Sequence, residues 1–148
     1  MASVNATGSS TNISSGTISA KKYLWIQFYD ENGVGGAMTF NNDSGSNYAR
    51  RGSLNGAADF AITSTTSMSV TVGGNSGFNN IFVINNASNE KLVISHGIAS
   101  SSAGAGTAPQ RKEEVDKWTN TSNQITEIDF DAGTNYGSKS FLKVWGAD

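Results

Sequence analysis

The chain has 148 residues and no cysteine, and its 10 basic and 12 acidic residues give a formal net charge of −2. Without cysteine there is no disulfide framework and no zinc–thiolate site, so packing and hydrogen bonds must hold the fold together. The charges are nearly balanced and scattered, which gives no electrostatic footprint for nucleic acid or an anionic membrane. We therefore expect neither partner.

The length and the 36% hydrophobic content predict one domain with a core of its own. The 17 glycines, the single proline and the many Ser, Thr and Asn residues favour strands and turns over helices. No apolar run approaches the roughly 20 residues that span a bilayer, and the N-terminus lacks the pattern of a signal peptide. We expect an all-β protein made in a cytoplasm.

Residues 1–20 form a Ser/Thr/Asn/Gly-rich stretch with only Val4, Ile13 and Ile18 as isolated apolar points. Such a composition is disordered unless something holds it. We expect an extended N-terminal arm that becomes ordered on a neighbouring subunit, followed by a single domain over 21–148. The alternative is that the arm lies along its own sheet.

The first strong strand is predicted over residues 23–29, followed by a turn at Asn32-Gly33. Period-two alternation separates its two faces. The inward row is Leu24, Ile26 and Phe28, and the outward row is Tyr23, Trp25, Gln27 and Tyr29. The aromatic row on the outward side is unusual for an isolated domain.

Five further strands are predicted before residue 96 from the same alternation. Their apolar positions are Met38 and Phe40, Phe60 and Ile62, Met68, Val70 and Val72, Ile81 to Ile84, and Leu92 and Ile94. The run from Ile81 to Ile84 is apolar at every position, which is typical of a strand buried on both faces.

A connection follows over 96–109, and then a charged segment over 111–117. A connection this long is usually functional or mobile. We expect the whole stretch to be a contact loop with a solvated charged surface, in which Arg111 and Glu114 belong to a polar rim.

Two final strands are predicted near 125–130 and 141–145. In the first, Ile128 and Phe130 point inward while Asp129 and Asp131 face water. In the second, Leu142 and Val144 point inward and leave Phe141 and Trp145 outside. Eight short strands at this spacing predict a jelly-roll two-sheet β-sandwich.

Three spaced motifs resemble those of virion structural proteins of tailed bacteriophages. They are Phe40-Asn41-x-Asp43-x-Gly45-x-Asn47-Tyr48, Trp118-x-Asn120-Thr121-x-x-Gln124-Ile125-Thr126-x-Ile128 and Gly137-Ser138-x-x-x-Leu142-x-Val144-x-Gly146. Together they span most of the chain after residue 22. The resemblance implies a jelly-roll domain in the virion, with capsid decoration or cement as the nearest fit, and it implies the major capsid protein and sister subunits as partners. It brings no catalytic residues.

Tests for chemistry give no strong site. His96 is the only histidine, so a catalytic triad or a zinc site lacks its usual companions. The loop from Asn41 to Asn47 has oxygen side chains at calcium-loop spacing but lacks the required glycine and glutamate, so a turn is favoured. Asp129 and Asp131 are better explained as the solvated side of a strand than as an acid–base pair. We expect no enzyme activity, cofactor or metal.

Two functions of different classes therefore stand beside each other. The first is an assembly component located in the virion. The second is a tail, receptor-binding or carbohydrate-binding β-sandwich that stacks its aromatic side chains on sugars. The fold resemblance implies that the first and last strands lie side by side, as in a jelly roll, so their aromatic rows are expected to merge into one outward patch. The predicted interface residues are Tyr23, Trp25, Tyr29, Phe141, Trp145, Arg111 and Glu114.

Overall fold

The computed structural model describes residues 1–148 and contains eleven strands and no helix. The strands are β1 (Ala2–Asn5), β2 (Asn12–Ser14), β3 (Tyr23–Asp30), β4 (Ala37–Phe40), β5 (Tyr48–Leu54), β6 (Phe60–Thr65), β7 (Gly77–Ile84), β8 (Lys91–Ala99), β9 (Gln110–Trp118), β10 (Ile128–Asp131) and β11 (Phe141–Ala147). The predicted all-β class is confirmed.

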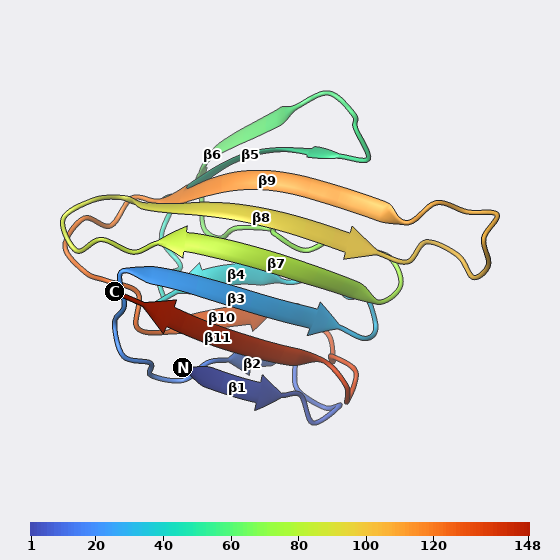
Figure 1. Cartoon of the computed structure of the whole chain (residues 1–148), viewed down its shortest axis with the longest axis horizontal. Coiled ribbons are helices and arrows are strands. Elements are labelled where there is room, and N and C mark those ends of the chain that lie inside the picture. The colour runs from blue at the N-terminus through green and yellow to red at the C-terminus, as the bar shows by residue number, and fades with distance from the viewer.

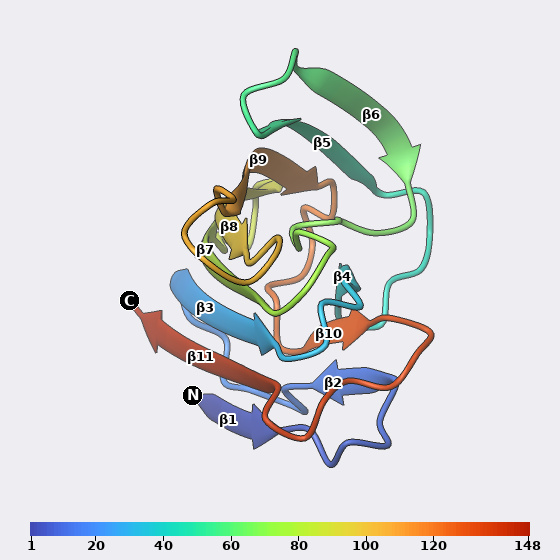
Figure 2. The ribbon, with the colours of Figure 1, turned by 90° about the vertical axis from the view of Figure 1, so that its right-hand side faces the viewer.

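Two antiparallel sheets pack against each other. The large sheet has eight strands in the order β1-β11-β3-β7-β8-β9-β5-β6, and the small sheet has three in the order β2-β10-β4. Figure 1 looks onto the large sheet with the small sheet behind it, and Figure 2 shows the two as separate layers. The expected β-sandwich is confirmed, while the jelly-roll connectivity within it stays a prediction. The expected pairing of the first strong strand with the last is also present, as β3 beside β11.

The core lies between the sheets and is built from the inward positions of alternating strands. In β3 these are Leu24, Ile26 and Phe28, each at most 3% exposed. The Phe28 ring stacks on Phe130 of β10 at a centroid distance of 4.0 Å, which joins the two sheets. Burial of such side chains stabilises the fold by roughly 1.5–3 kcal/mol each. The predicted faces of β3, β4 and β11 are therefore confirmed.

The N-terminal segment differs from the expectation of an arm on a neighbouring subunit. Strand β1 pairs with β11 at the edge of the large sheet, and β2 pairs with β10 in the small sheet. Ile13 and Ile18 are buried in the core of their own chain. Strand pairing and a few apolar contacts, from Ala6, Ile13 and Ile18, thus hold a segment whose average composition predicts disorder.

The charged segment 111–117 is not a loop, which corrects the prediction of a long contact loop. It lies within β9, which pairs with both β8 and β5, so only residues 100–109 connect β8 to β9. Strand β5 was missed as well. The predicted strand at Met68–Val72 is instead an extended segment with a single bridge, between Met38 and Met68, although Met68, Val70 and Val72 are buried.

Asp129 does not face water as predicted. It is 7% exposed and lies between Ser14 of β2 and Thr39 of β4 in the small sheet. Burial raises the pKa of its carboxyl group. The prediction failed because the N-terminal segment adds a strand beside β10, whereas Asp131 at the strand end is exposed as expected.

Candidate interaction surface

The outer face of the large sheet, meaning the face turned away from the small sheet, carries an apolar row that crosses five strands. The pairing register brings one residue from each of β11, β3, β7, β8 and β9 side by side. This apolar row consists of Trp145, Trp25, Phe82, Ile94 and Val115. Its last three members are each close to half exposed, at 47%, 53% and 50%.

The aromatic end of this row is ordered by stacking. Trp25 lies against Trp145 at a centroid distance of 4.8 Å and against Phe82 at 6.2 Å. The Trp25 Nε1–H donates a hydrogen bond to the Asn80 side-chain oxygen. The two tryptophans are thus held in place before any partner arrives, which lowers the entropy lost on binding.

An end row adjoins the apolar row. It consists of Tyr23, Ile84 and Leu92, which are 45%, 43% and 51% exposed. The end row and three members of the apolar row, Phe82, Ile94 and Val115, line a shallow groove of about 590 Å³ that extends to Ile62 on β6. A soluble monomer rarely exposes so continuous an apolar surface, so this face is a candidate binding surface.

Beyond the apolar row runs a polar row on the same five strands. It consists of Lys143, Gln27, Asn80, His96 and Glu113. A second apolar row follows, formed by Phe141, Tyr29, Phe78 and Ile98, and it ends at Arg111 on β9. Charged groups in these two rows therefore sit at the ends of the rows, Lys143 on β11 and Glu113 with Arg111 on β9.

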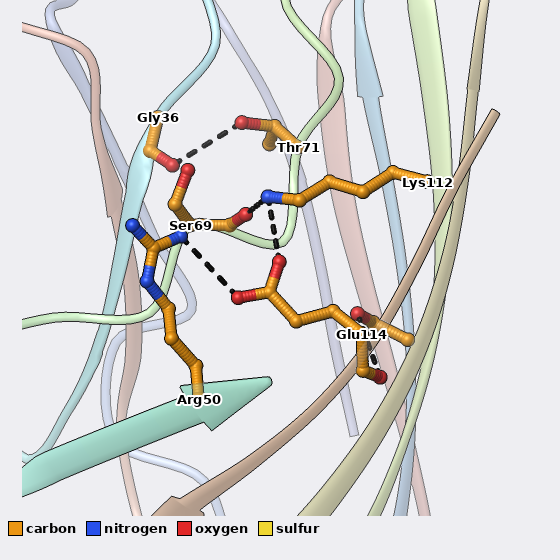
Figure 3. A network of polar contacts seen from close by, with 7 residues as sticks. Gly36, Arg50, Ser69, Thr71, Lys112 and Glu114 are labelled. Atoms are coloured by element: carbon orange, nitrogen blue, oxygen red, sulfur yellow. Dashed lines mark hydrogen bonds and ion pairs between the residues drawn. The ribbon is translucent and has the colours of Figure 1, made fainter. Parts of the chain in front are cut away.

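The inner face of β9 carries charged residues, in contrast to the apolar rows on the outer face of the sheet. Lys112, Glu114 and Asp116 alternate inward. Strand β5 adds Arg50 next to Glu114 and Lys112 (Figure 3). Glu114, whose side chain is fully buried, lies 3.3 Å from the Arg50 Nη1 and 2.6 Å from the Lys112 Nζ. The Lys112 ammonium also donates to the backbone oxygen of Ser69. Pairing of this kind is what allows charges to occupy an interior.

Asp116 is the unpaired member of this cluster. It is 5% exposed, and neither carboxyl oxygen has a hydrogen-bond partner. Arg50 sits opposite Asp116 in the strand register but directs its guanidinium to Glu114 instead. Burial, together with the nearby Glu114 carboxylate, raises the pKa of Asp116 to about 8. The carboxyl group is therefore mostly protonated at neutral pH.

The segment over Met68–Val72 closes this interior, and Gly97 makes room for it. A Cβ at Gly97 would lie 2.8 Å from a Val72 methyl carbon and 2.6 Å from the Asn79 side-chain oxygen. Only glycine admits so close an approach between this segment and β8. The charged interior is thus enclosed by extended chain and not by a second sheet.

The first predicted motif forms a structural turn, as favoured over an ion site. Asp43 accepts hydrogen bonds from the Trp118 indole at 2.7 Å and from the Gly45 amide at 2.9 Å. Burial acts to raise the pKa of Asp43, but the hydrogen bonds from Trp118, Gly45 and Asn47 lower it overall. Asn41, at φ +52°, accepts from the Thr126 amide. The motif residues therefore join β4, β5 and the approach to β10.

A polar hollow of about 340 Å³ lies beside this turn. Its lining is made only of polar residues, namely Asp43, Asn47, Thr119, Asn120, Thr121, Ser122 and Asn123. Amide and hydroxyl groups of this kind form hydrogen bonds with sugars or water. The Trp118 ring is 1% exposed, so it offers this hollow no stacking surface.

The structure brings most of the predicted interface residues together. Tyr23, Trp25, Tyr29, Phe141 and Trp145 share the outer face. Trp25 and Trp145 are stacked, while Tyr29 and Phe141 form a tilted pair with ring centroids 5.7 Å apart. Arg111 is exposed at the margin of the same face. Glu114 is not on any surface, because β9 turns it inward. That part of the prediction is corrected.

Sequence reasoning missed the aliphatic half of the outer face. Leu92 and Ile94 were expected to point inward, but β8 buries Lys91, Val93 and Ser95 instead. Phe82 and Ile84 were expected to be buried on the second face of β7, and both are exposed in the single chain. The sequence feature that could have revealed this half is the run Ile81–Ile84, which is apolar at every position. Such a run indicates that both faces of the strand are covered, the outer one by another protein surface.

No helix in the structure is long and apolar enough to cross a bilayer. No protein-family model matches the chain, and comparison with curated proteins gives no match. The argument for a function therefore rests on the residues and geometry described above.

Proposed function

We propose that the protein is a structural component of a tailed-bacteriophage particle, a jelly-roll decoration or cement protein that attaches to the capsid by protein–protein contacts. The observation that carries the proposal is the exposed apolar row of Trp145, Trp25, Phe82, Ile94 and Val115 on the outer face. The three motifs, which resemble those of virion proteins, are the reason for proposing a bacteriophage particle as its place. The location follows as the virion, at the capsid surface.

The composition of the outer face fits a protein partner. Interface centres are enriched in Trp, Tyr and Phe, and energetic hot spots are most often Trp, Tyr or Arg in well-packed positions. Trp25 and Trp145 are such anchors. They lie beside aliphatic residues and are bordered by Lys143, Glu113 and Arg111, which resembles the polar rim around an interface core.

A carbohydrate-binding or tail role is the second candidate, and the polar hollow beside Asp43 and Asn47 is the observation that favours it. Sugar sites usually combine such polar groups with an aromatic platform. Here the exposed aromatic side chains belong to the outer face, while Trp118 beside the hollow is buried. The assembly role uses more of the observed surface, so we favour it.

The proposal includes no catalytic role. His96 is exposed on the outer face, where the strand register places it between Asn80 and Glu113. Its neighbours in that row are polar groups of a surface and not a nucleophile with a base. An enzymatic activity that is lost on changing His96 would overturn this part of the proposal.

Copy number in purified particles tests the proposed function. Quantitative mass spectrometry is expected to find the chain in proportion to the capsid lattice, and a handful of copies per particle would instead indicate the tail. Particles stripped of the protein should rebind wild type but not a Trp25→Ala/Trp145→Ala variant. The exposed Asp59→Lys variant, changed in the turn between β5 and β6, serves as the control that still binds. Absence of the chain from the particles contradicts the proposal.

A further inference from the structure

We infer that a second copy of this chain covers the outer face. The two copies are related by a twofold axis that runs parallel to β7 and lies midway between their facing large sheets. The inference rests on the proposed function and narrows it, because it makes a sister subunit the partner of the apolar row and the dimer the unit that attaches to the capsid. Three observations lead to it: the central place of β7, the order of side chains along each row, and the opposite charges at the two margins.

Strand β7 is the middle of the five strands that carry the rows, with β3 and β11 on one side and β8 and β9 on the other. A twofold axis along β7 therefore sets β11 of one copy over β9 of the other, and β3 over β8. Positions along the strand direction are unchanged by this rotation. Each row consequently faces the same row of the second copy, apolar on apolar and polar on polar.

The apolar row is self-complementary in size under this axis. Trp145 faces Val115 of the second copy, Trp25 faces its Ile94, and Phe82 faces Phe82. Each large aromatic ring at the β11 side thus meets a smaller aliphatic residue from the β8 and β9 side. Alternation of large and small residues across facing positions is how packed layers interdigitate.

The polar row supplies charge complementarity. Lys143 at one margin faces Glu113 of the second copy, and symmetry forms this pair twice. Within one chain Glu113 has only the exposed Arg111 as an ion-pair partner, at 3.0 Å, so it is free to meet Lys143.

The charges also choose between the two possible in-plane axes. An axis across the strands, through the polar row, sets Lys143 on Lys143 and Glu113 on Glu113, and such like-charge contacts are unfavourable. The axis along β7 sets the strands of the two copies nearly parallel, and the two right-handed sheets twist in the same sense across the interface, as they do about either axis, so the charges alone make the choice. Nearly parallel strands give the aligned packing, with strand directions within about 30°, that β-sandwiches use.

Charge reversal measured by sedimentation equilibrium tests the inference. Wild type is expected to form a dimer. Lys143→Glu alone and Glu113→Lys alone should each weaken the dimer by about tenfold or more, since each places like charges together twice. The double variant Lys143→Glu/Glu113→Lys restores opposite charges and should recover affinity to within about threefold of wild type. Asp59→Lys, away from the face, should leave the dimer unchanged.

Far-UV circular dichroism of every variant shows that the domain stays folded, which both surface positions allow. A wild-type chain that is monomeric at all concentrations overturns the inference. So does a dimer that is indifferent to both single reversals or is not rescued by the double variant. If the chain is monomeric and yet the Trp25→Ala/Trp145→Ala variant fails to rebind particles, self-pairing is wrong while the proposed function stands. If the chain dimerises but is absent from particles, the proposed function is wrong while self-pairing stands.

Discussion

Strands β11, β3 and β7 turn aliphatic and aromatic side chains toward the small sheet, whereas β9 and β5 turn Lys112, Glu114 and Arg50 toward the interior (Figure 3). On the outer face the first region is apolar and aromatic, so it is an ordinary sandwich half with additional aromatic rings outside. In the second region β9 is charged on both faces and exposes only Val115 as an apolar residue, while the neighbouring β8 exposes Leu92 and Ile94. Polar groups inside with aliphatic groups outside are an arrangement that an isolated domain does not need.

The comparison teaches that burial within one chain does not account for the sequence of β8 and β9. Leu92, Ile94 and Val115 are about half exposed, while Lys91 and Glu114 of the same strands are at most 2% exposed. Apolar side chains contribute stability only where they leave water. The outward aliphatic residues make physical sense when another protein surface covers them.

The largest expected effect comes from breaking the charged interior. Glu114→Ala removes the only carboxylate that pairs with both Arg50 and Lys112. It leaves the part-buried Arg50 without an ion-pair partner and the buried Lys112 with only the Ser69 carbonyl oxygen. We expect a loss of about 3–5 kcal/mol in the free energy of unfolding, measured with urea. Glu113→Ala, at the neighbouring outward position, is the matched control, with a change within about 0.5 kcal/mol. Equal effects at the two positions would contradict the inward assignment of Glu114.

Changing the aromatic anchors should act on association and not on folding. Trp25→Ala/Trp145→Ala is expected to cost about 4 kcal/mol of association, at about 2 kcal/mol for each hot-spot residue. The far-UV spectrum should stay as in wild type, because neither side chain belongs to the core between the sheets. Titration of the partner monitored by sedimentation measures the loss. Unfolding of the double variant, or association equal to wild type, contradicts the surface role.

The buried carboxyl group of Asp116 should make the free energy of unfolding depend on pH, an effect that the apolar region cannot produce. Its pKa is about 8 in the folded chain and near 3.8 when unfolded, so the folded state binds the proton more tightly. This contribution is fully present below about pH 4 and is lost as the pH rises through 8, with a slope of up to about 1.4 kcal/mol per pH unit. Urea midpoints from pH 5 to 8 should fall in wild type and flatten in Asp116→Asn. Equal slopes in the two proteins would show that Asp116 is not the titrating group.

The smallest expected effect tests which face of β8 points into the core. Val93 is 1% exposed and Leu92 is 51% exposed, although both are aliphatic neighbours in sequence. In dilute monomer, Val93→Ala should lower the free energy of unfolding by about 1 kcal/mol or more, while Leu92→Ala should change it by less than about 0.5 kcal/mol. Thermal melts at low protein concentration measure both. A larger loss at Leu92 would mean that the strand faces are reversed.

Alternation predicted the first strong strand, the last strand and their inward residues, because their apolar positions differ clearly from the polar ones. It failed at β9, where charged residues occupy both faces and the pattern carries no hydrophobic period. It reversed β8, because Leu92 and Ile94 are more apolar than the inward Lys91 and Ser95. The aromatic half of the candidate surface could be predicted from the strand faces. The aliphatic half depends on pairing partners that only the three-dimensional register reveals.

Hydroxyl-radical footprinting of the three tryptophans tests the central claim most directly. Trp118 is 1% exposed within its own chain and serves as the internal control, protected in every state. Trp25 is 39% exposed in the single chain and stacks on Trp145 at the outer face. We predict that oxidation of Trp25 and Trp145 is strong in the dilute isolated chain and falls to the level of Trp118 in purified particles. Equal oxidation of Trp25 and Trp145 in the dilute chain and in the particles would contradict the account.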